Sequence, residues 1–286
     1  LRQMILILCR EETNDTLCLS AELINRGHKT ITLTPQKINI NFSQGKISFH
    51  LGNQLLNLKC VLGWVSLHQR AIGLPLLETI EFAGIPVINN STTLRIGGNK
   101  FLSSCLLTKA NIPHIKTEIV CGSEGIKSAL KKIGFPLVLK PVIGAKGQDV
   151  TLINSIENFY TLSKNNFSQS YPLYLQSVIN KPDRDIRVTV IDFKAHSAFY
   201  RTLGEGGFVT NLSRGGSWLP CDLDRETASL AEKAAVAINA PIAGVDLIED
   251  IDTNQLRVIE VNVTPSLTNP FPSVIQPVSD LFNQYL

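Results

Sequence analysis

The first 89 residues alternate between short apolar runs and amphipathic stretches, and this alternation is the strongest constraint on the fold. Strands and helices are predicted in turn at Met4–Leu8, Leu17–Arg26, Thr30–Leu33, Cys60–Leu62, Leu74–Ala83 and Ile85–Ile88. Strand–helix–strand repeats of this kind place parallel strands in one sheet that helices cover. The G-x-G-x-x-G motif of dinucleotide sites does not occur in the sequence. We therefore expect an α/β domain without a dinucleotide site.

After residue 89 the pattern changes from α/β to α+β. A helix is predicted from Lys100 to Ala110, and a glycine-containing loop joins two β-rich runs within Gly134–Ile153. Two further strands, Ile186–Ile191 and Ala198–Arg201, precede a helix at Arg225–Ala237. We expect three regions, at residues 1–89, 90–175 and 176–286.

Composition and charge exclude several classes of protein. The formal net charge of +3 comes from dispersed lysines and arginines, so we expect no nucleic-acid partner. The apolar run Met4–Leu8 is far shorter than a membrane span, so we expect no membrane partner and a cytoplasmic location. The six cysteines include no C-x-x-C pair, and the five histidines are isolated, so neither a zinc site nor a redox motif is indicated.

Two consecutive strands near the C-terminus bring acidic side chains together. Gly244–Asp250 and Leu256–Asn262 are both strand-like, and the residues between them are typical of a turn. If this hairpin is symmetric, Asp246 lies directly opposite Glu260. Asn262 is two residues beyond Glu260 and therefore points to the same face of the strand. We expect three oxygen-bearing side chains to converge there.

This hairpin has two readings of equal weight. Two carboxylates and an amide oxygen are hard ligands that suit magnesium held jointly with nucleotide phosphates. Alternatively, the acids form ion pairs with nearby lysines or arginines at the edge of a sheet. The same symmetric register places Glu249 opposite Arg257, as a favourable cross-strand pair.

A second set of residues suggests a site for a polyanion. Lys140 ends an apolar strand, and the loop Gly144–Gly147 beyond it carries Lys146. Glycine backbone can approach phosphate oxygens closely, although such a loop taken alone is more often an ordinary hairpin. No G-x-x-x-x-G-K-[ST] motif occurs, so P-loop chemistry is excluded. Further basic candidates are Lys100, Arg187, Arg201 and Arg214.

Taken in chain order, these elements resemble the RimK-like ATP-grasp ligases, over about Ile85 to Ser266. The elements that carry the resemblance are Lys100, Lys140–Pro141, Gly144–Gly147, Asp185–Val188, Tyr200–Arg201, Asn211–Gly216, Ala243–Asp246 and Glu260–Asn262. The resemblance implies an N-terminal Rossmann-like pre-ATP-grasp domain (1–89), followed by an ATP-grasp N-terminal lobe with a phosphate lid loop (90–175) and a C-terminal lobe with the magnesium site (176–286).

The resemblance also implies a role for each matching residue. Lys100, Lys140 and the Gly144–Gly147 loop would bind the phosphates of ATP. Adenine would be held by the backbone of the hinge, and ribose by Asp185. The hinge residues are Gln176, Ser177, Val178 and Ile179. The implied metal ligands are Asp246, Glu260 and Asn262, for two magnesium ions or manganese. The implied catalytic residues are Arg201, Lys140 and Arg187, with Asn211 close to them.

Three positions depart from the pattern of the family. Asn99 stands where an acidic residue usually precedes the lysine, and Ser177 stands where the hinge usually has a glutamate. These two changes would alter nucleotide binding. Thr264-Pro-Ser266 replaces the usual Pro-Gly, which would alter a loop close to the acceptor pocket.

The function implied is that of an ATP- and magnesium-dependent ligase. A substrate carboxylate would attack the γ-phosphorus to form an acyl phosphate, and an amine would then displace phosphate to form an amide. The expected amine is an amino acid, L-glutamate being the common one in the family. The acceptor would be a metabolite, a coenzyme or a protein tail, and a homo-oligomer is compatible with the sequence.

Two other functions are weighed against this ligase: a regulatory module that binds nucleotide without ligation, and a ligase with a different amine donor. The identity of the acceptor has no code in the sequence, because substrate pockets in such folds are built from loops. For acceptor contacts we consider the stretch Asn262–Pro272 and the helix around Leu67–Leu77, with His68 and Arg70. Both segments could equally serve packing and surface.

Overall fold

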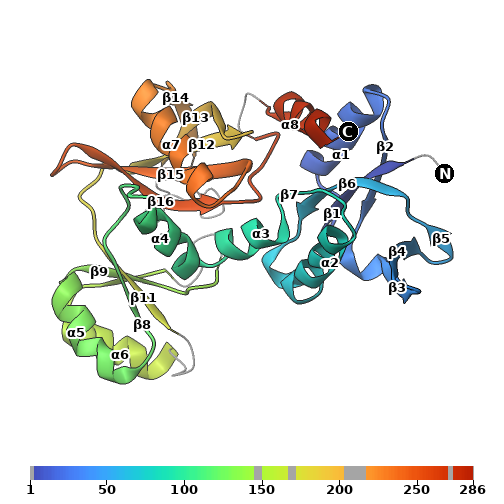
Figure 1. Cartoon of the computed structure of the whole chain (residues 1–286). Coiled ribbons are helices and arrows are strands. Elements are labelled where there is room, and N and C mark those ends of the chain that lie inside the picture. Colours follow the sequence, from blue (N-terminus) through green and yellow to red (C-terminus); the bar gives the residue numbers. More distant parts are fainter. Residues whose placement is uncertain (1–2, 145–149, 167–171, 203–216, 270–272, 286) are drawn as a thin grey trace.

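The computed structural model describes residues 3–144, 150–166, 172–202, 217–269 and 273–285 (Figure 1). Within these ranges the strands form an N-terminal parallel sheet, a small meander beside it, and two antiparallel sheets that belong to the rest of the chain. The mixed α/β and α+β class expected from the sequence is confirmed.

The N-terminal sheet has the strand order β2–β1–β6–β7, and every neighbouring pair of strands is parallel. Its elements are β1 (Met4–Cys9), α1 (Asn14–Asn25), β2 (Lys29–Leu33), β6 (Leu58–Trp64), η2 (Leu67–Gln69), α2 (Arg70–Phe82) and β7 (Val87–Ile88). Each strand and helix predicted for this region is present. α1 begins at Asn14, before the predicted start at Leu17, because a capping box at Thr13 starts the helix there.

β1 is buried on both of its faces, because helices cover each side of the sheet. Leu6 and Leu8 belong to a core cluster shared with α2, while Ile5 and Ile7 belong to a second cluster with α1. This second cluster also contains the last helix, α8 (Ile275–Phe282), which the sequence did not predict. The end of the chain therefore returns to the N-terminal sheet and packs beside α1 (Figure 1).

A short antiparallel meander lies between β2 and β6 in the chain and was also not predicted. It follows η1 (Pro35–Lys37) and consists of β3 (Asn39–Ser43), β4 (Lys46–Leu51) and β5 (Gln54–Leu55). Most of its side chains are exposed or half-buried, so hydrophobic periodicity marks it only weakly.

The middle of the chain forms a four-stranded antiparallel sheet in the order β10–β9–β11–β8. Its elements are β8 (Thr117–Val120), α5 (Ser123–Ile133), β9 (Leu137–Lys140), β10 (Thr151–Ile153), α6 (Ile156–Asn166) and β11 (Leu173–Ser177). α5 and α6 pack on the face that carries Leu139 and Leu175. Because side chains alternate along a strand, Lys140 and Gln176 lie on the opposite face. The boundary expected at residue 175 falls inside β11, and the three-region division remains a prediction.

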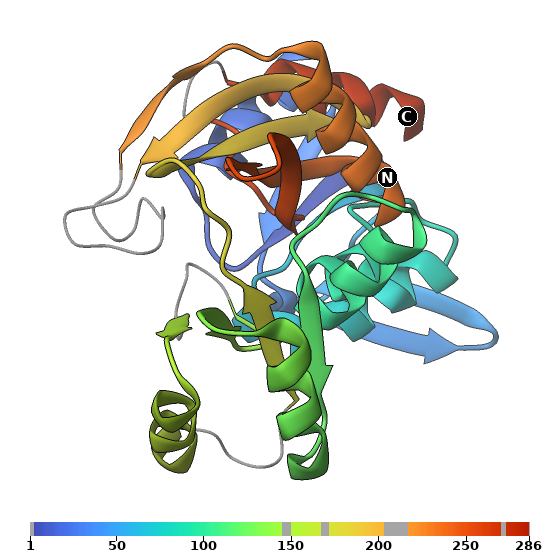
Figure 2. The same ribbon diagram turned by 90° about the vertical axis from the view of Figure 1, so that its left-hand side faces the viewer.

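The C-terminal sheet has the order β14–β13–β12–β15–β16 and is antiparallel throughout. Its elements are β12 (Arg184–Ile191), β13 (Lys194–Thr202), β14 (Trp218–Cys221), α7 (Arg225–Ala237), β15 (Ile242–Asp250) and β16 (Gln255–Asn262). Val245 and Leu247 face the core that contains α7, so Asp246 between them faces the other side of the sheet. The middle sheet with α5 and α6 is called the middle lobe below, and the C-terminal sheet with α7 the C-terminal lobe. Figure 2 shows the middle lobe facing the C-terminal lobe, and β11 leads from one to the other.

The N-terminal and C-terminal sheets meet at a buried asparagine. Asn89 follows β7, and its Nδ2 donates to the carbonyl oxygens of Ile242 at 2.7 Å and Val263 at 2.8 Å. Its Oδ1 accepts from the backbone N–H of Ile242 at 3.1 Å. These bonds join the end of β7 to the start of β15 and the end of β16. α3 (Ser91–Gly97) and α4 (Lys100–Lys109) follow at once and lead into the middle lobe, and η4 (Asn283–Tyr285) ends the described chain.

Candidate active site

The acidic residues expected to converge lie on the β15–β16 hairpin. Asp246 pairs directly with Glu260, as the symmetric register predicted, and Gly244 pairs with Asn262. The Nδ2 atom of Asn262 lies 3.1 Å from Oε1 of Glu260 and 3.3 Å from Oδ2 of Asp246. Asp246 is buried, whereas Glu260 and Asn262 are half-buried. Two of the three oxygen-bearing groups can therefore be reached from outside the sheet.

The second pairing predicted for this hairpin is wrong. A register shift after Asp246 leaves an extra residue in β16, so Glu249 lies opposite Leu256 rather than Arg257. Arg257 instead donates from Nε to Oδ2 of Asp250 at 2.8 Å. Such a bulge changes which residues face each other, and a symmetric count of residues cannot detect it.

Two arginines meet the buried carboxylate of Asp246. Arg187 is directly opposite it on β12 and binds both carboxylate oxygens, with Nη2 at 2.9 Å from Oδ2. Arg201 on β13 places Nη2 at 2.8 Å from the same oxygen. Arg201 also binds Asp185 through Nε at 2.7 Å and Nη2 at 2.9 Å. Arginine and aspartate side chains thus alternate across the neighbouring strands β13, β12 and β15.

These ion pairs set the protonation of the buried groups. Burial alone would raise the pKa of Asp246, but Arg187 and Arg201 outweigh it and hold this pKa below its ordinary value. Burial alone would lower the pKa of Arg201, but Asp246 and Asp185 outweigh it and raise this pKa. Asp246 therefore stays ionised and Arg201 stays charged near neutral pH.

Two lysines approach the same region from other elements. Lys140 ends β9, and its Nζ donates to Oε1 of Gln176 at 2.6 Å. Burial lowers the pKa of Lys140 to about 8, although Glu260 opposes this shift. Lys100 begins α4, and its Nζ donates to the carbonyl oxygen of Gly144 at 3.2 Å. Burial also lowers the pKa of Lys100, again opposed by Glu260. An anion between these lysines would favour their charged forms.

Gln176 belongs to a buried polar network that sequence reasoning missed. Its Nε2 donates to the hydroxyl oxygen of Tyr174 at 3.2 Å and to Oγ1 of Thr117 at 3.3 Å. The Tyr174 hydroxyl also lies 2.8 Å from Oγ of Ser104. These contacts hold the amide so that its oxygen faces Lys140. A usable signal was present, because Tyr174 and Gln176 are two apart and so share one face of β11.

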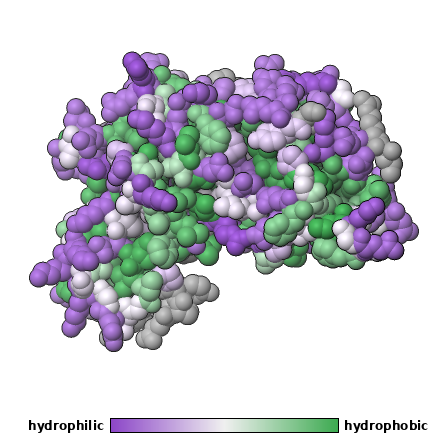
Figure 3. Space-filling model, in the orientation of Figure 1, coloured by the Kyte–Doolittle hydropathy of each residue, from purple (hydrophilic) through white to green (hydrophobic). Residues whose placement is uncertain are grey.

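A narrow cavity of about 40 Å³ lies between α4 and β16. It is lined by residues expected to bind phosphate and metal, namely Lys100, Gly144, Glu260 and Asn262, and by Gly97, Gly98 and Tyr174 among others. The expected hinge residues Ser177, Val178 and Ile179 line a different and larger pocket of about 780 Å³. Figure 3 shows a concave surface between the lobe that contains α5 and α6 and the N-terminal sheet with its helices.

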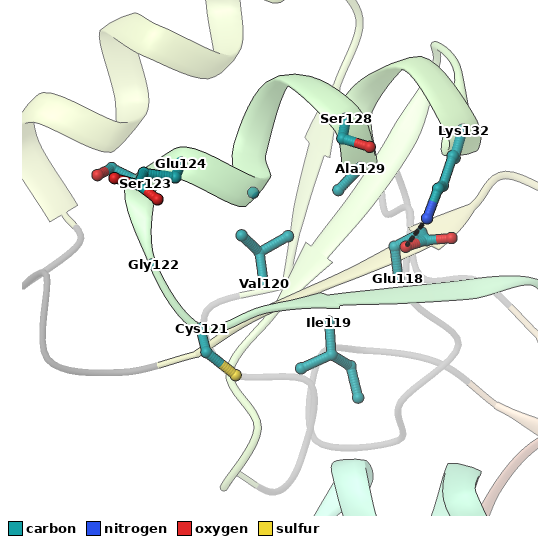
Figure 4. Close-up of a pocket in the computed structure, with 11 residues that line it drawn as sticks. Glu118, Ile119, Val120, Cys121, Gly122, Ser123, Glu124, Ser128, Ala129 and Lys132 are labelled. Atoms are coloured by element: carbon teal, nitrogen blue, oxygen red, sulfur yellow. Dashed lines mark ion pairs between the residues drawn. The ribbon is translucent and has the colours of Figure 1, made fainter.

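Another pocket, of about 620 Å³, lies on the outer side of the middle lobe and is drawn in Figure 4. It is lined by β8 and by residues along α5 as far as Lys132. Its one drawn ion pair joins Lys132 and Glu118 at 3.9 Å. None of the expected site residues lines it, so we do not assign the reaction to this pocket.

The departures from the family pattern have local explanations. Asn99 is the N-cap of α4 and accepts a hydrogen bond from the backbone N–H of Leu102 at 3.2 Å. The backbone N–H of Ser177 donates to the carbonyl oxygen of Lys116 at 3.0 Å. Ser266 donates to Oδ1 of Asp15 at 3.2 Å, which ties the loop after β16 to the start of α1.

Several expected residues lie outside the described part of the chain. These are Lys146, Gly147, Asn211 and Arg214. In the described ranges no three residues of the His, Cys, Asp and Glu types form a metal-binding group. The expected metal set has two carboxylates and one amide, so it does not depend on such a group. Among the described residues, no helix has both the length and the hydrophobicity that are needed to cross a bilayer.

Comparison with known proteins settles the family. The RimK-like ATP-grasp domain model matches residues 97–272, which is more than half of the chain. The chain belongs to the RimK-like ATP-grasp family. Solved structures agree with the fold that this family implies. The ATP-grasp ligase PsnB has a TM-score of 0.75 at 17% identity, with all of both chains covered. A RimK-domain ATP-grasp protein from Sphaerobacter thermophilus has a TM-score of 0.74 at 20% identity, with 97% and 98% covered.

Two curated relatives of this RimK-like protein are named as ligases. A tetrahydromethanopterin:alpha-L-glutamate ligase of Methanosarcina acetivorans is 35% identical over 217 residues, which is 67% of each chain. An alpha-aminoadipate–LysW ligase of Saccharolobus solfataricus is 36% identical over 206 residues, which is 71% of this chain and 74% of the relative. The RimK-like protein described here is an ATP-dependent ligase, as the sequence predicted.

Proposed function

We propose that this ligase joins an amino acid to a carboxylate acceptor through an acyl phosphate, releasing ADP and phosphate. The observation that carries the proposal is the meeting of Asp246, Glu260 and Asn262 with cationic groups from four other elements, which are β12, β13, β9 and α4. Carboxylates with adjacent lysines and arginines suit a polyanionic nucleotide and the charge that develops during phosphoryl transfer.

We also propose that Asp246, Glu260 and Asn262 hold magnesium or manganese. Their side chains supply hard oxygen donors, which are the ligands that these ions prefer. The Nδ2 atom of Asn262 now faces both carboxylates, and rotation of this amide by half a turn would present its oxygen instead. Such an ion would neutralise phosphate charge and act as a Lewis acid.

The remaining side chains have complementary roles in this proposal. Lys100 and Lys140 would bind phosphate oxygens, and the network around Gln176 would keep the Lys140 ammonium in place. Arg201 is anchored by two carboxylates, so its charge is held in one position for the transferred phosphoryl group or the acyl phosphate. Asp185 would act through Arg201, in addition to the ribose contact that the resemblance implies.

The proposed amino acid carries two carboxylates. The relatives are named for L-glutamate and for alpha-aminoadipate, which differ by one methylene group in the side chain. We propose L-glutamate or a close homologue for this ligase. The names of the relatives also include tetrahydromethanopterin and LysW, and we propose an acceptor that is either a small molecule or a protein tail.

The test is magnesium-dependent ADP release with a panel of amino acids, each combined with carboxylate metabolites and acidic peptides. We expect one dicarboxylic amino acid to stimulate ADP release, together with a mass gain on one acceptor. Tight ATP binding without stimulated release across the panel would contradict the ligase and favour a regulatory module. Stimulation by an amine of another class would instead identify a ligase with a different donor.

A further inference from the structure

Arg70 lies beside the narrow cavity between α4 and β16, called the cleft below, on the helix considered above for acceptor contacts, and the family resemblance gives it no role of its own. It is the first residue of α2, and its guanidinium packs against Gly98, a residue that lines the narrow cavity. A Cβ atom added to Gly98 would lie 1.4 Å from Nη1 of Arg70. A residue with a side chain at position 98 would therefore displace the guanidinium.

The guanidinium of Arg70 is half-buried, and its Nε finds no hydrogen-bond acceptor within the described ranges. The other arginines of the site differ from it, because Arg187 and Arg201 each bind a carboxylate. Burial lowers the pKa of Arg70, and no carboxylate in the described part of the chain opposes this shift. A buried donor without an acceptor destabilises a protein, so such a group is expected to have a partner in the substrate-bound state.

Lysines from other elements are already available for phosphate. Lys100 and Lys140 lie on α4 and β9, whereas Arg70 comes from the N-terminal domain. A planar guanidinium fits a carboxylate through two parallel hydrogen bonds better than an ammonium group does. A guanidinium binds phosphate in the same way, so the assignment of Arg70 to a substrate rests on its place on α2, away from the two lysines that are expected to bind phosphate.

We infer that Arg70 binds a carboxylate of a substrate at the edge of the cleft nearest the N-terminal domain. This inference deepens the proposed function and rests on it only for the identity of that substrate. The carboxylate belongs either to the amino acid or to the acceptor. The experiment has one arm for each.

The experiment is calorimetric binding to the full chain, with magnesium and a non-hydrolysable ATP analogue present. The amino-acid probes are L-glutamate and L-glutamine, which lacks the side-chain carboxylate, and the acceptor probe is a peptide ending in glutamate. We expect Arg70→Gln to lower the binding affinity for one carboxylate probe about 10- to 100-fold, because one charge-assisted hydrogen bond is lost. The affinity for the ATP analogue should not change.

Arg95→Gln is the matched control, because Arg95 is an exposed arginine of α3 that pairs with Glu78. It should bind every probe as the wild type does. Gly98→Ala tests the same inference without removing the charge, since its Cβ would displace the guanidinium. We expect it to weaken the same probe as Arg70→Gln does.

Three outcomes would overturn the inference. They are unchanged carboxylate affinity in Arg70→Gln, an equal loss of ATP-analogue affinity, and no binding of any carboxylate probe by the wild type. Failure of the ligase proposal gives a different result. In that case a probe binds through Arg70, but no amino acid stimulates ADP release.

Discussion

At the scale of single residues, the site combines one buried carboxylate with one that remains accessible. Asp246 is 2% exposed and neutralised by Arg187 and Arg201, whereas Glu260 is half-buried and forms no ion pair within the described ranges. The two acids face each other across the hairpin, yet their environments differ. We therefore expect substitutions of Asp246 and Glu260 to differ in their effect on stability. Both substitutions should abolish activity.

Asp246→Asn should lower the free energy of unfolding by about 3–5 kcal/mol, because it leaves the half-buried guanidinium of Arg187 without its carboxylate and removes one of the two carboxylates that bind Arg201. Glu260→Gln should change the free energy of unfolding by less than about 1 kcal/mol. Both variants should lose ligase activity. Urea unfolding and ADP release measure the two effects, and equal destabilisation would contradict the assigned environments.

The contribution of Asp246 to stability should depend on pH in a defined direction. The pKa of Asp246 is lower in the folded state than in the unfolded state. Its contribution is therefore fully present above the unfolded-state pKa, near ~3.9, and is lost as the pH falls through the lower folded-state value. The gap in unfolding free energy between wild type and Asp246→Asn should narrow in this acid range.

The lowered pKa of Lys140 predicts how ATP affinity depends on pH. Its pKa is about 8 in the free protein, and phosphate would favour its charged form. ATP affinity should thus be highest below pH 8 and fall by up to about tenfold per pH unit above pH 8. Lys140→Arg stays charged throughout and should reduce this dependence to the part that Lys100 contributes, whose pKa burial also lowers. Calorimetric titrations from pH 7 to pH 10 would contradict the assignment if both proteins gave the same profile.

At the scale of elements, α8 illustrates a helix whose sequence is too short to be recognised alone. It spans Ile275–Phe282, and its apolar residues complete the cluster that covers one face of β1. Isolated helices of this length are marginal in water, so α8 depends on packing against α1 and the sheet. The ion pair between Arg26 and Asp280 adds a contact at 2.5 Å on its exposed side.

Phe282→Ala should therefore destabilise the protein by about 3–5 kcal/mol, because it opens a cavity beside α1. Phe42→Ala is the matched control, since Phe42 on β3 is 69% exposed and should cost less than about 1 kcal/mol. Urea unfolding followed by circular dichroism compares the two. A similar loss in both variants would contradict the packing role of α8.

At the scale of the whole molecule, the active site needs three parts of the chain at once. The acids and arginines lie on the C-terminal sheet, and Lys140 and Gln176 lie on the middle sheet. The N-terminal domain is joined to the C-terminal sheet through Asn89. This joint holds the end of β16 next to Gly97, where the glycine lets Val263 pack closely.

Asn89→Ala would leave the backbone N–H and carbonyl groups of this joint without partners in a buried place. We expect the free energy of unfolding to fall by about 2–4 kcal/mol. Asn41→Ala, at an exposed position on β3, is the control and should have little effect. Urea unfolding measures both, and an unchanged midpoint for Asn89→Ala would show that the joint is not needed for stability.

Local pattern was sufficient for the elements that have a strong period of their own. The parallel N-terminal sheet, α4, α7 and the facing positions of Asp246 and Glu260 all follow from alternation of apolar and polar residues over short distances. The residues that match the family follow from their order along the chain. Residue types and their spacing are properties of the sequence, so the sequence by itself determined the class of fold and the family.

Tertiary structure alone decided the partners of these residues. The bulge in β16 moved Arg257 away from Glu249, and the pairing of Arg187 with Asp246 depends on how β12 lies beside β15. The partnerless Nε of Arg70 emerges only when α2 is placed against Gly98. Contacts between distant segments depend on register and packing across many residues, and no local pattern records them.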